Sequence, residues 1–144
     1  MPKKRKLTAK DIMVKPKIVS ARAKISEIRK DLIGKENCLT VVDEAGNFMG
    51  EVHELDLLKL VIPEERLEGE DVAGVMGAAY DPEFTGHTAE MIMRKHEITV
   101  PPGTDATDVA IIMYKEDVRS VPVMQKKKII GVIHLNQVIR KMLK

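Results

Sequence analysis

The chain contains two copies of one unit, and this duplication constrains its fold more than any other feature. Residues 8–13 (TAKDIM) are matched 80 residues later by residues 88–93 (TAEMIM). Residues 50–53 (GEVH) are matched 81 residues later by residues 131–134 (GVIH). A solenoid needs three or more repeats to bury its faces, so two copies exclude it. Two similar units can instead pack about a pseudo-two-fold axis, which creates two related clefts.

The composition is that of a globular domain. The 144 residues are 44% hydrophobic and 32% charged, and they can bury a real core. With only 3% aromatics, that core must consist of Ile, Val, Leu, Met and Ala. No apolar run approaches the roughly 18–20 residues that span a membrane, and no secretory signal is present. The lack of a long apolar run predicts no membrane partner. Because the single cysteine cannot form an internal disulfide, we expect a cytoplasmic protein.

Two short basic segments stand out, although the net charge is only +2. The tail over residues 1–7 contains Pro2-Lys3-Lys4-Arg5-Lys6 and resembles a nuclear-import or nucleic-acid arm. A solvated, frayed terminus is the simpler interpretation. The second segment, residues 126–128 (KKK), separates two apolar runs and predicts a hairpin turn.

Each copy shows the same order of signals, which predicts a β-α-β-β-α unit of α/β (α+β) class with a small sheet against two helices. A short helical turn over residues 9–13 or 89–93 precedes each unit. The expected strands are 17–19, 39–42 and 48–52 in copy one, and 97–100, 120–124 and 129–133 in copy two. In copy two the helix that follows the first strand is capped by Thr104 or Asp105. The expected buried helix positions are Ile25, Ile28, Leu32, Leu55, Leu58, Val61 and Ile62, and in copy two Ala106, Val109, Ile112, Met113, Val138, Met142 and Leu143.

The copies span residues 8–62 and 88–144, and the connector over residues 63–87 matches neither. Pro63 and the acidic residues after it predict a short helix. The small apolar segment 72–79, with Tyr80 and Phe84, has two interpretations that stay open. It packs on the flank of its own module, or it forms a contact surface for a second copy in a homodimer.

The duplicated, ordered set of motifs resembles a tandem pair of cystathionine-β-synthase (CBS) domains, known as a Bateman module. The resemblance rests on the T-A-x-x-I-M openings, on the apolar-Gly-x-apolar-x-x-x-Asp ending, and on residues 119–123 (RSVPV). It implies two CBS units packed about a pseudo-two-fold axis through their small sheets. It also implies a regulatory module that binds AMP, ADP, ATP or S-adenosylmethionine in the clefts, without a catalytic cofactor.

In the family pattern, a Ser or Thr three residues after the Gly and an Asp six after it face the cleft, where the Asp accepts hydrogen bonds from the ribose hydroxyls. In copy one these positions are Gly50, His53 and Asp56. In copy two they are Gly131, His134 and Gln137. The resemblance therefore implies a ribose clamp in the first cleft and leaves the second without its carboxylate.

The resemblance also suggests the rest of each cleft. The first strands would lie along the adenine, residues of the second strands would pack the base, and a base before the strand would contact phosphate. These residues are Ile18, Val19, Ile98 and Thr99 for the adenine edge, Val41 and Pro122 for packing, and Arg119 beside Ser120 for phosphate. By the repeat offset, the counterpart of Arg119 is Cys38. Arg22 and Lys24 are further candidates, and ordinary surface charge is an open alternative for all three bases.

The recurrence of His53 and His134 has three open interpretations: contact with the ligand, a shared metal near the pseudo-two-fold axis, or a structural role at the strand ends. No Cys or further His is spaced to complete a zinc site, so we predict no metal. The chain also lacks nucleophile-elbow, zinc-protease and phosphate-loop motifs, so we predict no enzyme activity.

The leading functional hypothesis is an adenine-nucleotide sensor that passes its signal to an unidentified protein partner or to a second copy. One alternative is a nucleic-acid-binding protein that uses its basic tail and Lys126–Lys128. The other is a structural dimerisation module with empty clefts.

Overall fold

The structure, a computed structural model, describes residues 6–34, 38–63, 66, 86–95 and 98–143. The chain divides into two compact units, which are described separately. Unit 1 comprises residues 1–16 and 97–144, and unit 2 comprises residues 17–96. Residues 2–5 of the basic tail and the apolar connector segment 72–79, with Tyr80 and Phe84, lie outside the described residues, so the expectations about them stay predictions.

Unit 2 contains a three-stranded sheet in the order β1-β2-β3. Strand β1 (Ile18–Ser20) runs parallel to β2 (Cys38–Val42), which is antiparallel to β3 (Phe48–His53). The helical elements are α2 (Ile25–Ile28), the 3-10 helices η1 (Arg29–Asp31) and η2 (Glu54–Leu60), and α4 (Ala89–Ile92). Alternate strand residues point into one hydrophobic core, as the period of a strand requires. Its buried members are Ala21, Ile25, Ile28, Leu32, Leu39, Val41, Val52, Leu60, Ala89 and Ile92.

The turn between β2 and β3 forms as its sequence predicts. The Asp43 carboxylate accepts hydrogen bonds from the backbone N–H groups of Ala45 and Asn47 at 2.9 and 2.8 Å. Gly46 has φ of +82°, a region that glycine enters without steric cost. In the hairpin that this turn closes, Cys38 lies opposite His53 and Thr40 lies opposite Glu51.

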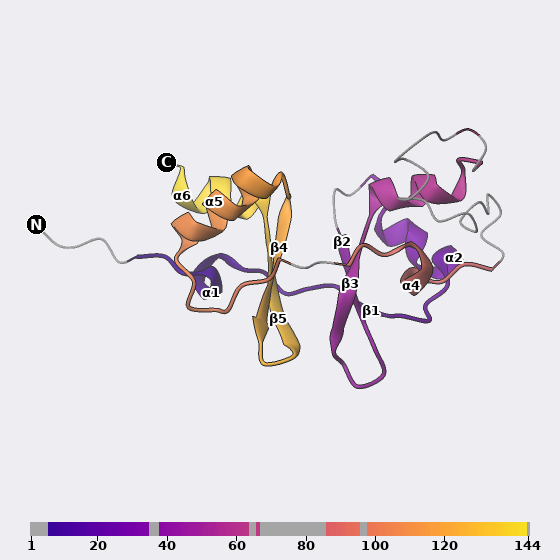
Figure 1. The fold of residues 1–144 in the computed structure, drawn as a ribbon, viewed down its shortest axis with the longest axis horizontal. Helices are drawn as coiled ribbons and strands as arrows, with labels where there is room; N and C mark the ends of the chain where they lie inside the picture. Colours follow the sequence, from indigo (N-terminus) through magenta and orange to yellow (C-terminus); the bar gives the residue numbers. More distant parts are fainter. Residues whose placement is uncertain (1–5, 35–37, 64–65, 67–85, 96–97, 144) are drawn as a thin grey trace, which may run out of the picture. The chain divides into compact units, whose positions relative to one another are not determined.

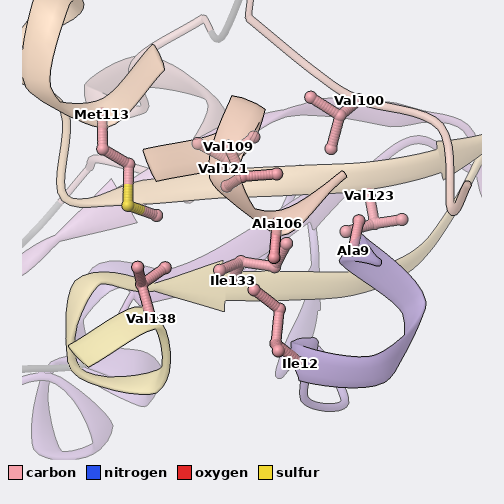
Figure 2. Packing of buried hydrophobic residues seen from close by; sticks show 10 residues of the cluster. All are labelled: Ala9, Ile12, Val100, Ala106, Val109, Met113, Val121, Val123, Ile133 and Val138. Carbon is pink, nitrogen blue, oxygen red and sulfur yellow. The ribbon is translucent and has the colours of Figure 1, made fainter. Parts of the chain in front are cut away.

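Unit 1 is built on the antiparallel pair β4 (Ser120–Gln125) and β5 (Lys128–His134). Its helices are α1 (Ala9–Ile12), α5 (Ala106–Glu116) and α6 (Leu135–Met142). Lys126, with φ of +58°, lies in the tight turn between the strands, where the lysine run predicts a turn. The strand expected over residues 97–100 is reduced, in the described part, to one parallel bridge between Val100 and Val123. Figure 2 shows the core, formed by Ala9, Ile12, Val100, Ala106, Val109, Met113, Val121, Val123, Ile133 and Val138.

The opening segment of each repeat belongs to the unit that contains the other repeat. Helix α1, indigo in Figure 1, packs against α5, α6 and β5, and Val14 exchanges two backbone hydrogen bonds of 2.9 Å with Val132. Helix α4 packs against β3 and η2, and Arg94 exchanges the equivalent bonds with Glu51 at 2.7 and 2.9 Å. Each strand β3 and β5 thus gains a pairing partner from a distant part of the chain.

The prediction that Leu55, Leu58 and Val61 are buried in the helix after β3 is wrong. Leu55 is 61% exposed, and Leu58 and Val61 are also exposed, whereas Leu60 is fully buried. The reason is that this segment is a 3-10 helix, in which residues three apart lie on one line. Leu55, Leu58 and Val61 share one exposed face. In α6, Val138 is buried as predicted, but Met142 and Leu143 are exposed.

Helix α5 begins with a side-chain cap at Asp105. Its carboxylate accepts a hydrogen bond from the backbone N–H of Thr107 at 2.9 Å, so Asp105, rather than Thr104, is the cap. Lys6 Nζ lies 3.3 Å from the same carboxylate. The Thr107 hydrogen bond first, and the Lys6 interaction second, lower the pKa of Asp105 below its ordinary value of 3.8.

Because of this lowered pKa, Asp105→Asn is expected to reduce Tm at neutral pH although it keeps a capping oxygen. A carboxylate whose pKa is depressed by folding stabilises fully above its ordinary pKa, and the contribution is lost as the pH falls through the folded value. The Tm difference between wild type and variant should therefore shrink when the pH falls below 3.8. Thermal unfolding followed by circular dichroism across this range checks the prediction, and a difference independent of pH would contradict it.

Among the described residues, no helix is both long and apolar enough to cross a membrane.

Candidate functional site

The candidate site lies where β3 ends and η2 begins. His53 is the last residue of β3, and Asp56 follows three positions later in the first turn of η2. The Oδ2 atom of Asp56 accepts a hydrogen bond from the backbone N–H of His53 at 2.9 Å. An acidic side chain at this position satisfies a backbone donor that the helix leaves without a partner. Asp56 thus has a local structural role before any ligand is considered.

The other oxygen of Asp56 lies between two cations. Its Oδ1 accepts a hydrogen bond from Arg94 Nε at 2.6 Å and lies 3.2 Å from Lys59 Nζ. Lys59 also donates to the carbonyl oxygen of Ile92 at 3.1 Å. Asp56 is fully buried, so these cations offset the cost of removing its charge from water. The Arg94 side chain is 46% exposed, and solvent therefore screens its share of the attraction.

The second copy keeps the cap but has neither the carboxylate nor the arginine that pairs with it. Gln137 Oε1 accepts a hydrogen bond from the backbone N–H of His134 at 2.9 Å, as Asp56 does from His53. Val14, which pairs with β5 as Arg94 pairs with β3, takes the place of the arginine. The capping role is therefore common to both copies, whereas the buried carboxylate with a paired arginine belongs to unit 2.

Sequence reasoning missed the two cations beside Asp56. Lys59 could have been found, because it lies three residues after Asp56 in a helical segment and such pairs share a face. Arg94 carried no such signal. It lies 38 residues away from Asp56 and reaches it only because α4 packs against β3 and η2.

The other predicted ligand residues differ in accessibility. Ile18 and Thr99 are exposed, Val19 and Ile98 are half-buried, and Arg119 is exposed just before β4. The Val41 side chain is part of the core of unit 2. Ser120 and Pro122 are buried in β4, and Ser120 lies opposite His134. The structure also brings Val19 beside Val41 in unit 2, while their roles toward a ligand stay predictions.

The strand register corrects one expected correspondence. Cys38 lies opposite His53, and Ser120 lies opposite His134, so the counterpart of Cys38 is Ser120 rather than Arg119. The offset changes because the β4–β5 hairpin is one residue shorter than the β2–β3 hairpin. The two candidate bases near the first strand also have local roles. Arg22 lies 3.6 Å from Glu44 on the surface, and Lys24 precedes α2.

The duplication is matched in a known family. The chain matches the family described as "CBS domain" over residues 9–63 and again over residues 89–144. This chain belongs to the CBS domain family. The two matched segments coincide with the two copies of the repeat, so the chain is a tandem CBS pair. The uncharacterized protein MJ1404 of Methanocaldococcus jannaschii is 35% identical over 107 residues, which make up 74% of this chain but only 24% of that protein.

Solved structures of CBS proteins share the fold. CBSX2, a CBS-pair protein of Arabidopsis thaliana, has 21% identity and a TM-score of 0.73, with 96% of each chain covered. The structure of CBSX2 in complex with AMP has 20% identity and a TM-score of 0.76, and covers 94% of this chain and 96% of that one. The CBS domain of a CBS domain-containing membrane protein from Sphaerobacter thermophilus has 20% identity and a TM-score of 0.71. The match covers 96% of this chain and 90% of that one.

Proposed function

We propose that this CBS pair is a regulatory module that binds an adenosine nucleotide through unit 2 and passes the signal to a partner. The observation that carries the proposal is the Asp56 carboxylate, which occupies the ribose-binding position of the family pattern and has Arg94 and Lys59 beside it. The complex of the CBS-pair protein CBSX2 with AMP supports the ligand class.

The chemistry around Asp56 suits a ribose that carries phosphate. A carboxylate accepts hydrogen bonds from both hydroxyls of a cis-diol, and hydrogen bonds to a charged acceptor are the stronger kind. The Arg94 side chain is 46% exposed, so ribose hydroxyls that take over Oδ1 as their acceptor would free Arg94 to turn toward a phosphate. Arg94 and Lys59 would then supply positive charge beside the ribose. This favours AMP, ADP or ATP over the cationic S-adenosylmethionine.

The remaining expected contacts belong to the same proposal. Ile18 and Val19 of β1, with Val41 and His53, would complete the ligand environment in unit 2. In unit 1, the residues that we propose as ligand contacts are Ile98, Thr99, Arg119, Ser120, Pro122, His134 and Gln137. Since Gln137 is neutral, we expect the nucleotide to bind at Asp56 first.

Replacing Asp56 by asparagine tests this assignment, since Asn keeps an oxygen that can cap η2 but removes the charge. We expect the affinity for AMP to fall by about 1–3 kcal/mol, or roughly 5- to 150-fold. Isothermal titration calorimetry with AMP, ADP, ATP and S-adenosylmethionine measures it. Gln137→Asn is the matched control, which should leave the tightest nucleotide affinity unchanged.

Two results would contradict the proposal. One is an AMP affinity that Asp56→Asn leaves unchanged while circular dichroism shows an intact fold. The other is the absence of heat with every adenosine compound, which would favour a structural module with empty sites. Retention of RNA or DNA that weakens steeply with salt would instead support the nucleic-acid alternative.

Signal transmission would require a surface that contacts a partner. We propose that this partner is a second copy of the chain, in a homodimer. In unit 2, large apolar side chains are exposed at Leu55 and Leu58 of η2 and at Val61 just after it. In unit 1, Leu135 and Ile139 of α6 are exposed. An exposed apolar face of this kind, in either unit, is typical of protein contacts. The mass of the chain in solution, measured by analytical ultracentrifugation, decides between monomer and dimer.

A further inference from the structure

Three side chains with metal-binding atoms meet at the open end of the β2–β3 hairpin. Cys38 lies directly opposite His53, and Glu51 lies two residues before His53, so the pleat directs all three to one face of the sheet. One ligand atom from each residue, the Cys38 sulfur, a Glu51 oxygen and a His53 ring nitrogen, lies within 4.8 Å of the other two. Sequence reasoning missed this group because Cys38 and His53 become neighbours only through the hairpin register.

The spacing fits tetrahedral zinc. Zinc binds imidazole nitrogen and carboxylate oxygen at about 2.0–2.1 Å, which places these two atoms about 3.3 Å apart in a tetrahedral site. In the structure, His53 Nε2 and Glu51 Oε2 are 3.1 Å apart. A thiolate ligand at about 2.3 Å would lie about 3.6 Å from either atom. Since the ligand atoms lie within 4.8 Å of one another, the distance from the sulfur to each of the other two atoms needs to shorten by no more than about 1.2 Å.

The burial of Glu51 is the second argument. Its side chain is completely buried, Cys38 is buried, and the His53 side chain is 27% exposed. A buried carboxylate is costly unless positive charge offsets it. The fold itself does not require this cost, because in unit 1 the position of Glu51 is occupied by Val132, a buried apolar residue. The same comparison places Ser120 opposite His134, where unit 2 has Cys38 opposite His53. Only the histidine is common to both copies.

We propose that Cys38, Glu51 and His53 bind one zinc-class divalent cation, with water in the fourth position. A thiolate selects Zn²⁺ over the oxygen-preferring Mg²⁺ and Ca²⁺, and the partial exposure of His53 gives water a path to the open position. Binding removes the thiol proton, and the cation takes the place of the contact between His53 Nε2 and Glu51 Oε2. The site lies within unit 2 and shares His53 with the proposed nucleotide contacts, but metal binding to it is measured without nucleotide.

Cobalt titration of the full chain, purified through chelator, tests the site directly. Cys38 is the only cysteine, so a thiolate-to-cobalt charge-transfer band can arise only from this residue. We expect the band to saturate at one Co²⁺ per chain and to disappear when Zn²⁺ displaces the cobalt. Cys38→Ser should abolish it, because a hydroxyl does not replace the thiolate.

Two further variants keep the test independent of folding defects. Glu51→Val installs the residue of the other copy, so we expect a folded chain with a raised Tm without metal and no cobalt band. His134→Ala changes the equivalent histidine of unit 1 and should leave the band and stoichiometry intact. A folded wild type with no band, or a band that survives Glu51→Val, would overturn the proposal. A stoichiometry of one metal per two chains would also overturn it, since it would mean a site shared between copies.

Discussion

Replacing Leu60 by alanine is expected to lower the free energy of unfolding by about 2–5 kcal/mol, the cost of removing a large aliphatic side chain from a packed core. Leu60 is the last residue of η2, is fully buried, and belongs to the core of unit 2. Unfolding by denaturant, followed by far-ultraviolet circular dichroism because the chain has no tryptophan, measures the loss.

Leu55→Ala is the matched control for Leu60→Ala. It removes the same side chain from the same 3-10 helix, but Leu55 is 61% exposed. A surface substitution of this kind is expected to change the free energy of unfolding by no more than about 0.5 kcal/mol. Equal losses for the two variants, or a larger loss for Leu55→Ala, would show that η2 buries the opposite face.

Replacing Gly50 by alanine is the second large effect, with an expected loss of about 1–3 kcal/mol from overpacking. A Cβ at Gly50 would collide with the backbone carbonyl oxygen of Arg94 and would lie 3.1 Å from Met93 Sδ. The backbone cannot yield without losing the pair of hydrogen bonds between Arg94 and Glu51. We therefore expect a lower Tm and, because Arg94 is displaced from Asp56, altered nucleotide affinity.

Gly131→Ala is the control for Gly50→Ala at the equivalent position of unit 1. The three atoms nearest to its Cβ would be Sδ, Cγ and Cβ of Met13, and the outer part of a flexible methionine side chain moves more easily than a backbone carbonyl. We expect a smaller loss of stability than for Gly50→Ala. The same denaturant titration compares the two variants, and a larger loss at Gly131 would refute the view that backbone contact makes Gly50 the stricter position.

The two glycines show why a sequence motif can be right before its cause is known. The spacing from Gly50 to Asp56 and from Gly131 to Gln137 identifies the two CBS endings, and the family match covers both. The structure adds the physical reason for the glycine: the segment after α1 or α4 passes directly over the strand at this point. Local spacing cannot reveal this, because the segment comes from the other repeat.

The candidate site was predictable only where its determinants are local. The cap between Asp56 and the His53 amide spans three residues, and the helical pair with Lys59 spans three more. Arg94, in contrast, reaches Asp56 through the packing of α4. The buried face of the helix after β3 was predicted wrongly because the sequence does not distinguish a 3-10 helix from an α-helix over so short a segment.

The sequence by itself determined the duplication, the order of strands and helices, the hairpin turns at Asp43 and Lys126, and membership of the CBS domain family, since all of these depend on residues close together in the chain. Only the tertiary structure decided which copy each opening helix joins, which face of η2 is buried, and which charges surround Asp56. It also decided that Cys38 meets Glu51 and His53, because only the pairing of β2 with β3 brings these residues side by side. Such long-range choices follow from how a whole unit closes its core and pairs its strand edges, which no local pattern encodes.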